Sequence, residues 1–348
     1  MDDIQRRTFC ATLAAASVYA EVSAVGDALV LESDSSLLDK QGDFVRAPSS
    51  SQLCAKPFIK WVGGKGQLLT QLDALLPKDI ASKENLTYCE PFVGGGAMLF
   101  FMLGKCPNIT RAVINDLNGE LVATYRSVKN APEELIELLR KLQSQYRACK
   151  TEEERKQFYL AQRERYNKRG LREVEVAALF IFLNRTCFNG LYRVNSKGLF
   201  NVPFGKSVNP LICDEDTIHA DSKLLQKVEI LNGDFEQVEK RLGSGAFVYF
   251  DPPYRPLTQT ASFTAYAKDG FNDEEQKRLA AFCRRLDQAG HQWLLSNSDP
   301  HNTDPSDMFF EDIYAGFDIR RVSASRMINS DASGRGKIAE LAIRNYKE

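Results

Sequence analysis

The order of apolar and polar positions along the chain predicts strands that alternate with helices. Short apolar runs end in turn residues at 86–89, 112–114 and 246–250, as buried strands do. Late runs at 317–322 and 340–344 alternate with a period of two. Because strands and helices follow one another, the pattern indicates an α/β fold on a mostly parallel sheet.

The pattern changes in the middle of the chain, where it predicts helices that pack on one another. Asn130 and Pro132 precede an amphipathic run, for which Asn130 is the expected cap. Thr151 with Glu154 forms a capping box at the start of a second helix. Residues 174–183 are nearly all apolar, so we expect them to form the buried helix of this region.

These patterns divide the chain into four segments. Residues 56–118 and 214–348 are the predicted halves of one α/β domain, and residues 119–213 are the helical domain inserted between them. A chain of 348 residues exceeds one typical domain, which agrees with this division. Residues 1–55 are expected to be a poorly ordered extension, because their second half is rich in Ser and Asp.

The composition is that of a soluble globular protein, with 43% hydrophobic and 26% charged residues. The formal net charge is −1, yet residues 140–206 hold fifteen Lys and Arg against six Glu and no Asp. A basic region of this kind suggests contact with DNA, although a solvated helical face explains the charge alone equally simply. The eight cysteines form no C-x-x-C pair, so we expect reduced thiols and no metal site.

The first residues resemble a signal peptide in outline only. Arg6 and Arg7 precede an apolar stretch at 10–18, as in a twin-arginine signal. Asp2 and Asp3 cancel the positive charge, so we expect a cytoplasmic protein rather than an exported one. No apolar run approaches the roughly 20 residues that span a bilayer, and we expect no contact with membranes.

The segment Asp251, Pro252, Pro253, Tyr254 follows a predicted strand and carries the clearest chemistry. Two prolines stop the strand and leave carbonyl groups without partners, beside a carboxylate and an aromatic ring. The carboxylate of Asp251 and the carbonyl of Pro252 can accept both N–H groups of a planar amine, while Tyr254 stacks on its ring. The alternative is an ordinary turn that ends a strand.

A glycine-rich segment predicts a site for a nucleoside-bearing cofactor. It runs from Glu90 through Phe92, Gly94 and Gly96, between a predicted strand and a predicted helix. It is not the G-x-G-x-x-G pattern, and its glycines are expected to let the backbone approach a ligand closely. Asp116 ends the next strand, where an acid binds ribose hydroxyls; the alternative role for Asp116 is a helix cap.

An earlier turn, Trp61-Val62-Gly63-Gly64-Lys65, is not a phosphate-binding loop, because Gly66 stands where that motif needs Ser or Thr. We expect Trp61 to pack near a ligand and Lys65 to meet a carboxylate. The alternative is a surface turn with a core tryptophan.

The dipeptide Asn189-Gly190 predicts the tip of a hairpin that enters DNA. Arg193 is suited to bind the two major-groove acceptors of a guanine, and Asn189 to support that contact. Phe188 is suited to wedge into the base stack where a base leaves. Alternatively, Phe188 belongs to the core and Arg193 meets phosphate.

Together these segments, with Gly233-Asp234-Phe235, resemble the Dam-type DNA adenine-N6 methyltransferases in order and content, from about residue 56 to the C-terminus. The resemblance implies a Rossmann-like seven-stranded sheet with an inserted helical target-recognition domain. It implies S-adenosylmethionine as methyl donor and a flipped adenine in double-stranded DNA as acceptor. The implied catalytic residues are Asp251, Pro252, Pro253 and Tyr254. The implied cofactor-binding residues are Trp61, Lys65, Glu90, Phe92, Gly94, Gly96, Asp116, Asp234, Phe235 and Asp251.

The resemblance also implies the target sequence. Asn189, Leu191, Arg193 and Pro203 match family members that recognise GATC, and with Phe188 they are the implied DNA-binding residues. Phe188 stands where close relatives often carry tyrosine. We therefore expect GATC as the target, read by a protein that works as a monomer.

Other functions stay open at this stage. A cytosine-N4 methyltransferase would use the same amine contacts, and a DNA-binding module without catalysis would keep the basic region. Three biological roles stay open. The first is restriction-modification, with a cognate restriction endonuclease as functional partner. The others are the marking of strands for replication or repair, and a role in a phage. Residues 255–271 are expected to close over the adenine, and residues 325–337 to contact phosphates.

Overall fold

The computed structural model describes residues 55–255, 271–325 and 337–347, which belong to one compact unit. The predicted extension and the twin-arginine-like segment lie outside the described residues. So do the interior of the predicted closing loop at 256–270 and most of the predicted phosphate-contacting stretch, at 326–336.

The described residues contain a seven-stranded sheet, as predicted. Its strands are β1 (Leu86–Glu90), β2 (Ile109–Asp116), β3 (Val228–Asn232), β4 (Phe247–Phe250), β5 (Gln292–Ser298), β6 (Asp318–Ser325) and β7 (Lys337–Arg344). Their order across the sheet is β3-β2-β1-β4-β5-β7-β6. Neighbouring strands from β3 to β5 are parallel, whereas β7 is antiparallel to both β5 and β6. The chain is therefore α/β with a Rossmann-like sheet that an antiparallel hairpin closes.

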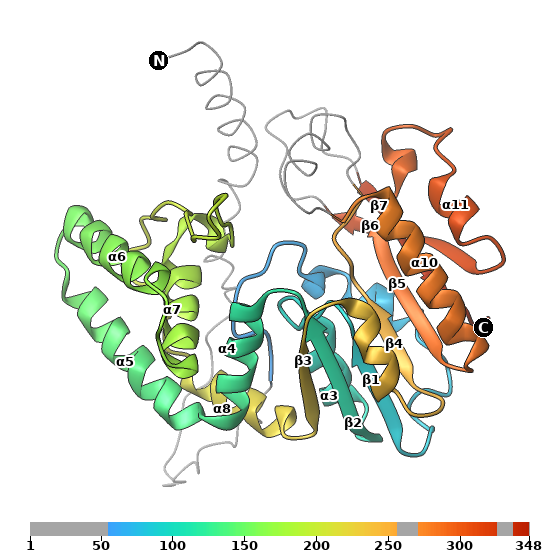
Figure 1. Cartoon of the computed structure of the whole chain (residues 1–348), viewed down its shortest axis with the longest axis horizontal. Coiled ribbons are helices and arrows are strands. Elements are labelled where there is room, and N and C mark those ends of the chain that lie inside the picture. The colour runs from blue at the N-terminus through green and yellow to red at the C-terminus, as the bar shows by residue number, and fades with distance from the viewer. Residues whose placement is uncertain (1–54, 256–270, 326–336, 348) are drawn as a thin grey trace, which may run out of the picture. The chain divides into compact units, whose positions relative to one another are not determined.

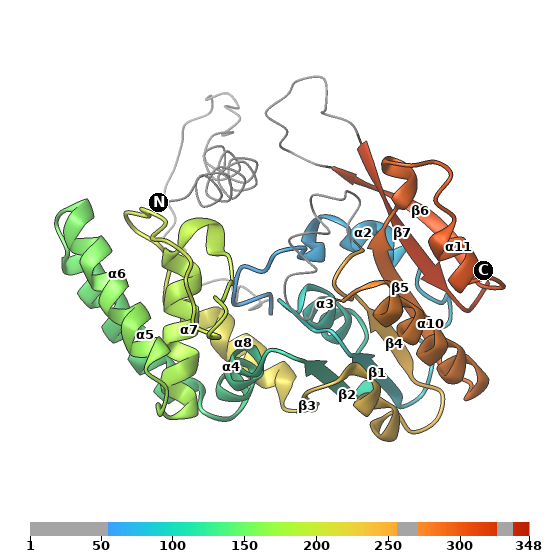
Figure 2. The ribbon, with the colours of Figure 1, turned by 45° about the horizontal axis from the view of Figure 1, so that its top comes forward.

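Helices cover both faces of this sheet (Figures 1 and 2). The α-helices are α2 (Leu69–Asp73), α3 (Ala97–Lys105), α4 (Gly119–Asn130), α5 (Pro132–Ala148), α6 (Glu152–Asn167), α7 (Glu173–Thr186), α8 (Glu215–Leu225), α10 (Asp273–Gln288) and α11 (Phe309–Ile313). The 3₁₀ helices are η1 (Lys65–Gln67), η2 (Phe188–Gly190), η3 (Phe235–Arg241) and η4 (Pro300–Asn302). Alternate residues of each strand face opposite layers. Tyr249 belongs to the core that includes α3 and α4, and Val248 belongs to the core that includes α10.

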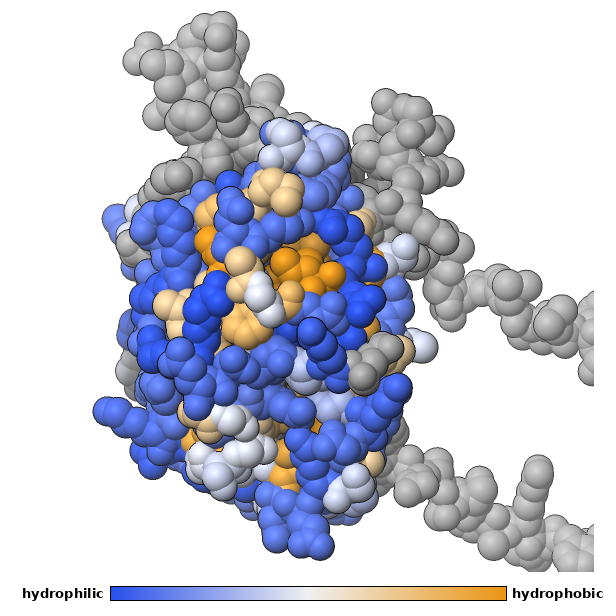
Figure 3. All heavy atoms as spheres, turned by 90° about the vertical axis from the view of Figure 1, so that its right-hand side faces the viewer, coloured by the Kyte–Doolittle hydropathy of each residue, from blue (hydrophilic) through white to orange (hydrophobic). Residues whose placement is uncertain are grey.

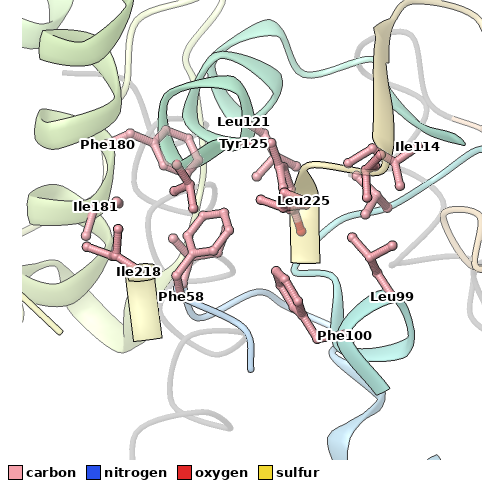
Figure 4. Packing of buried hydrophobic residues seen from close by; sticks show 14 of the residues in the cluster. Phe58, Leu99, Phe100, Ile114, Leu121, Tyr125, Phe180, Ile181, Ile218 and Leu225 are labelled. Carbon is pink, nitrogen blue, oxygen red and sulfur yellow. The ribbon is translucent and has the colours of Figure 1, made fainter. Parts of the chain in front are cut away.

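The insert of α5, α6 and α7 shares a core with the sheet. Phe180 and Ile181 of α7 and Tyr125 of α4 lie in the same buried cluster as Ile114 of β2 (Figure 4). Phe58, from the segment before the first glycine turn, packs edge-on against Tyr125 with 5.0 Å between ring centroids. This shared core joins α7, which directly precedes the residues predicted to bind DNA, to α4 and the sheet.

The caps of the insert helices are predicted in part. Thr151 and Glu154 form the expected capping box at the start of α6. The prediction for Asn130 is wrong, because α4 continues through Asn130. Ala131 takes the cap position of α5 without a side-chain hydrogen bond, and Pro132 begins the helix with its fixed φ.

The face that lies on the right of Figure 1 carries mainly hydrophilic side chains, with small apolar areas between them (Figure 3). Among the residues that the structure describes, no helix has the length and apolar character that crossing a membrane requires.

Candidate active site

The segment Asp251 to Tyr254 leaves the sheet at the carboxyl end of β4, where the sequence places it. The Nζ atom of Lys65 lies 2.9 Å from Oδ1 of Asp251 and also donates to the carbonyl of Gly63 at 2.9 Å. Lys65 is only 5% exposed, whereas the Asp251 side chain keeps 24% of its surface exposed. Lys65 therefore meets a carboxylate, as expected, and that carboxylate belongs to Asp251.

Glu340 of β7 adds a second carboxylate that was not among the predicted site residues. The Tyr254 hydroxyl donates to Oε2 of Glu340 at 2.6 Å, and Lys65 Nζ lies 3.9 Å from the same oxygen. Lys65 Nζ also sits 4.5 Å from the centre of the Tyr254 ring. Among the described residues no aromatic ring packs on Tyr254, which is partly exposed.

A buried amide network fixes the backbone of this segment. Gln276 and Asn297 are fully buried, and Gln276 donates to the carbonyl of Pro253 at 3.0 Å. Asn297 donates to Gln276 at 3.1 Å and accepts from the backbone N–H of Arg255 at 3.2 Å. Among the described residues no donor reaches the carbonyl of Pro252. The carbonyl that was predicted to receive an amine is thus the one left available.

Burial raises the pKa values of Asp251 and Glu90. Burial raises the pKa of Asp251 to about 6, although the Lys65 cation lowers it. Burial also raises the pKa of Glu90 to about 8, against the hydrogen bond of 2.6 Å that the Tyr88 hydroxyl donates to it. At neutral pH, Asp251 is therefore mostly ionised and Glu90 mostly protonated.

The free energy of unfolding is expected to fall as pH rises from about 4.5 to about 8, since unfolded Glu90 ionises over this range while folded Glu90 keeps its proton. Glu90→Gln should flatten this decline, measured by urea denaturation at a series of pH values. Asp221, whose pKa burial also raises to about 8, contributes in the same direction. Asp221→Asn is therefore the matched variant, and an unchanged slope in Glu90→Gln would contradict the assignment.

The glycine-rich turn packs on Trp61. A Cβ atom on Gly94 would lie 2.9 Å from the Trp61 ring, and one on Gly95 would lie 2.8 Å from Trp61 Cβ. Gly96 has φ +74°, and a side chain there would meet the hydroxyl of Tyr125, which donates to the Gly94 carbonyl. The glycines thus allow a close approach to two aromatic side chains, while the predicted approach to a ligand stays a prediction.

Replacing Gly95 with alanine is expected to displace Trp61 and to raise the dissociation constant of the cofactor about tenfold. The reason is the overlap with Trp61, since overpacking costs about 1–3 kcal/mol. Calorimetric titration measures the change. Gly104→Ala in α3 is the control, because a side chain there meets nothing within 4 Å and should stabilise the helix by about 0.5–1 kcal/mol. Unchanged affinity in Gly95→Ala would contradict the role of Trp61.

Asp116 ends β2 and accepts two backbone hydrogen bonds. Its Oδ2 accepts from Gly94 at 3.1 Å and its Oδ1 from Asn118 at 2.9 Å. The alternative role as a helix cap is wrong, because Asn118 caps α4 by accepting from Glu120 and Leu121. Asp116 instead ties the end of β2 to the glycine turn, and the residue is partly exposed.

Asp234 and Phe235 start η3 at the carboxyl end of β3. Asp234 is 51% exposed, and Arg278 donates to both of its oxygens at 3.1 and 2.7 Å, which lowers the pKa of Asp234. The Arg278 guanidinium lies 4.2 Å from the centre of the Phe235 ring. Phe92 packs beside Phe235 with 5.3 Å between ring centroids. Phe235 itself is buried, so Asp234 is the exposed member of the predicted pair.

These groups fit a cationic nucleoside. Asp251 and Glu340 share the single cation of Lys65, and Asp116 adds a third carboxylate at the carboxyl end of β2, whereas the protonated Glu90 adds no charge. Such a site favours a ligand with positive charge, and its aromatic rings suit a sulfonium. Within the described ranges, no group of three or more His, Cys, Asp or Glu is placed to hold a metal.

Residues 187–205 contain the residues predicted to bind DNA and are called the recognition segment for that prediction; their structure differs from the predicted hairpin. Asn189 and Gly190 have φ of +54° and +65°, as the turn dipeptide suggested, but they lie in η2 directly after α7. Part of the pairing lies farther on, where Val194 bridges Phe200 and Asn195 accepts from Gly198. The placement of the tip at Asn189-Gly190 is therefore wrong: a further antiparallel bridge joins Cys187 to Phe204, so η2 lies within one arm of the paired segment and the turn falls at residues 195–198.

The residues predicted to bind DNA lie along this segment with different exposure. Arg193 is exposed, and its guanidinium donates to the side chain of Asn201 at 2.8 Å and to its carbonyl at 3.3 Å. Pro203 is exposed and accepts from the backbone of Phe188 at 2.9 Å. Phe188 and Leu191 pack partly against the core. The segment thus presents Arg193 outward and anchors itself through its apolar residues.

The residues missed at the sequence level act through tertiary contacts. Glu340 starts the apolar part of a late strand, and a charge at that point was the one signal for it. Gln276 and Asn297 are amides within an otherwise ordinary helix and strand, and their role depends on the packing of α10 against β5. Arg278 follows Gln276 by two residues on α10 and gave no separate signal.

Comparison with known proteins finds a family model and several relatives that match most of this chain. A model of the D12 class of N6 adenine-specific DNA methyltransferases matches residues 61–328. The Type II methyltransferase M.MjaIII of Methanocaldococcus jannaschii is 49% identical over 294 residues, which cover 84% of this chain and 99% of that protein. The Type II methyltransferase M1.LlaDCHI of Lactococcus lactis subsp. cremoris is 42% identical over 298 residues, 84% and 95% of the two chains. The DNA adenine methylase of Escherichia coli (strain K12) is 32% identical over 286 residues, 82% and 94%.

Proposed function

Since the chain belongs to the D12 class of N6 adenine-specific DNA methyltransferases, we propose that its substrate is an adenine flipped out of duplex DNA within the sequence GATC. The methyl donor in this proposal is S-adenosylmethionine. The observation that carries it is the arrangement at the end of β4: an ionised Asp251, a Pro252 carbonyl to which no described residue donates, and a partly exposed Tyr254.

The acceptor side of the site would hold the adenine amine by two hydrogen bonds. Asp251 and the Pro252 carbonyl each accept one N–H of the amine, and the Tyr254 ring stacks on the base. The hydrogen bond from Tyr254 to Glu340 and the network through Gln276 keep these groups in place before the base arrives. Preorganised acceptors of this kind make the amine nitrogen more nucleophilic and direct its lone pair.

The donor side would be held by residues of four loops. Trp61 and Lys65 come from the first turn, Glu90, Phe92, Gly94 and Gly96 from the second, Asp116 from the end of β2, and Asp234 with Phe235 from the start of η3. In this assignment Asp116 accepts from ribose hydroxyls, while Asp234 and Phe235 frame the adenine ring of the cofactor. When bound, S-adenosylmethionine supplies a methyl group on a sulfonium, an electrophile that needs no deprotonated amine before attack.

The first role of Asp251 is therefore to accept a hydrogen bond from the amine and to orient it. Its second role is to accept the proton that the amine loses. Lys65 favours the ionised form of Asp251, which the amine contact requires. Positioning and polarisation supply most of the catalysis in this scheme.

The recognition segment supports the sequence assignment. Arg193 is exposed on a turn rich in polar groups, and a guanidinium pairs well with O6 and N7 of a guanine. Asn189 would support that contact, Phe188 would fill the space that the flipped base leaves, and Leu191 with Pro203 would shape the segment.

The proposal is tested by methyl transfer from labelled S-adenosylmethionine to two duplexes that differ only in GATC against GTTC. Incorporation into the GATC duplex alone is expected. Equal incorporation into both would remove the assignment of Asn189 and Arg193 while keeping the activity. Incorporation at cytosine would favour the N4 alternative, whose amine contacts are the same.

The wider role follows from this chemistry. We propose that the protein is a cytoplasmic monomer that binds double-stranded DNA and is associated with the nucleoid. Two relatives are named Type II methyltransferases, which supports a restriction-modification role with a cognate endonuclease as functional partner. Relatives named DNA adenine methylase support a role in marking DNA for replication or repair instead.

A further inference from the structure

Three parts of the chain enclose the side chain of Trp61. The glycine turn approaches it so closely that a Cβ on Gly95 would lie 2.8 Å from Trp61 Cβ. Phe180 of α7 stacks on the indole with 6.3 Å between centroids. Tyr192 of the recognition segment stacks at 5.8 Å with 26° between the ring planes. One wall around Trp61 thus comes from the segment proposed to contact DNA.

The buried side-chain amide of Asn184 joins the backbone before Trp61 to the backbone of the recognition segment. Asn184 accepts from the backbone N–H of Lys60 at 2.8 Å and donates to the Lys60 carbonyl at 2.8 Å. It also donates to the carbonyl of Gly190 at 2.8 Å. Gly190 lies against the Lys60 side chain, where a Cβ would approach to 2.8 Å. The residue before Trp61 and the start of the recognition segment are therefore held together.

Tyr192 also approaches the loop that carries Asp116. Its hydroxyl lies 3.4 Å from Oε2 of Glu120, in the first turn of α4. Asn118, which caps that helix, donates its backbone N–H to Asp116. Tyr192 thus contacts Trp61 through its ring and the helix beside Asp116 through its hydroxyl.

We propose that Tyr192 is a positioning residue that links the binding of DNA to the binding of the cofactor. This inference rests on the proposed function of the site. DNA that holds the recognition segment in place also holds Tyr192 against Trp61, so less conformational freedom is lost when the cofactor binds. The linkage is reciprocal, and bound cofactor strengthens the binding of DNA by the same factor.

Calorimetric titration with S-adenosylhomocysteine tests the linkage without methyl transfer. The dissociation constant is measured with and without an unmethylated GATC duplex, for the wild type and for Tyr192→Ala. In the wild type, the duplex is expected to lower the dissociation constant at least about fivefold, the lower end of typical coupling between sites. In Tyr192→Ala, this ratio is expected to fall to about one.

Two controls separate the linkage from a loss of structure. Tyr192→Phe keeps the ring and should keep the ratio, and Val194→Ala changes an exposed residue of the same segment away from Trp61. Thermal melting checks the fold, and Tyr192→Leu replaces Tyr192→Ala if the latter does not fold. A wild-type ratio of one, or an unchanged ratio in the folded ring-free variant, overturns the inference. Methylation of GATC by the wild type in that case leaves the proposed function intact, whereas absence of methylation on any duplex removes the proposed function itself.

Discussion

Asp251→Ala is expected to lower kcat for adenine methylation about 10²- to 10³-fold. The change removes a preorganised acceptor of the amine, and the loss of one such group at a reacting centre typically costs this much. Lys65 keeps Glu340 as a counter-ion at 3.9 Å, so the fold and part of the cofactor affinity should remain. Single-turnover rates with saturating cofactor and duplex measure the effect.

Two comparisons sharpen this expectation. Asp251→Asn keeps one acceptor oxygen without the charge, so it should lose less activity than Asp251→Ala. In the wild type, kcat/KM should fall as pH drops below about 6, because the protonated carboxyl accepts the amine poorly. A wild-type rate in Asp251→Ala, or a rate with no acid limb near pH 6, would show that Asp251 does not hold the amine.

Lys65→Met is expected to lower the free energy of unfolding by about 3 kcal/mol at neutral pH, the lower part of the cost of breaking a buried pair. The lower part applies because Asp251 and Glu340 keep 24% and 20% of their side-chain surfaces exposed. The variant leaves these two acids without their shared cation, so the pKa of Asp251 should rise further above its usual value. The acid limb of the rate profile should then move to higher pH.

Urea denaturation and the pH dependence of kcat/KM measure the two effects of Lys65→Met. Lys277→Met is the matched control, since Lys277 and its partner Glu274 keep 51% and 78% of their side-chain surfaces exposed. The control should change neither quantity appreciably. If Lys65→Met has the wild-type rate profile, then Lys65 does not set the ionisation of Asp251.

Local signals in the sequence predict the sheet and the segment from Asp251 to Tyr254. An apolar run that ends at two prolines predicted both β4 and the turn after it, because prolines stop a strand wherever it packs. Apolar runs likewise predicted β1 and β2, which end at Glu90 and Asp116. The glycine turn was also predicted, yet its neighbours Trp61 and Tyr125 could not be, since they come from distant parts of the chain.

The recognition segment shows where local signals are insufficient. Asn189-Gly190 has the positive φ values that its sequence favours, but positive φ serves the end of a helix as well as the tip of a hairpin. The pairing of Val194 with Phe200 decides between the two, and it depends on contacts across the segment. Glu340 and Gln276 likewise became part of the site only through the packing of β7 and α10.

The central claim is that the segment from Asp251 to Tyr254 presents the adenine of duplex DNA for N6 methylation. The most direct measurement is the nucleoside composition of a GATC duplex after incubation with S-adenosylmethionine carrying a deuterated methyl group. The wild type is expected to yield labelled N6-methyl-2′-deoxyadenosine, and Asp251→Ala to yield almost none. Label in N4-methyl-2′-deoxycytidine, or equal labelled adenine from the wild type and Asp251→Ala, would contradict the claim.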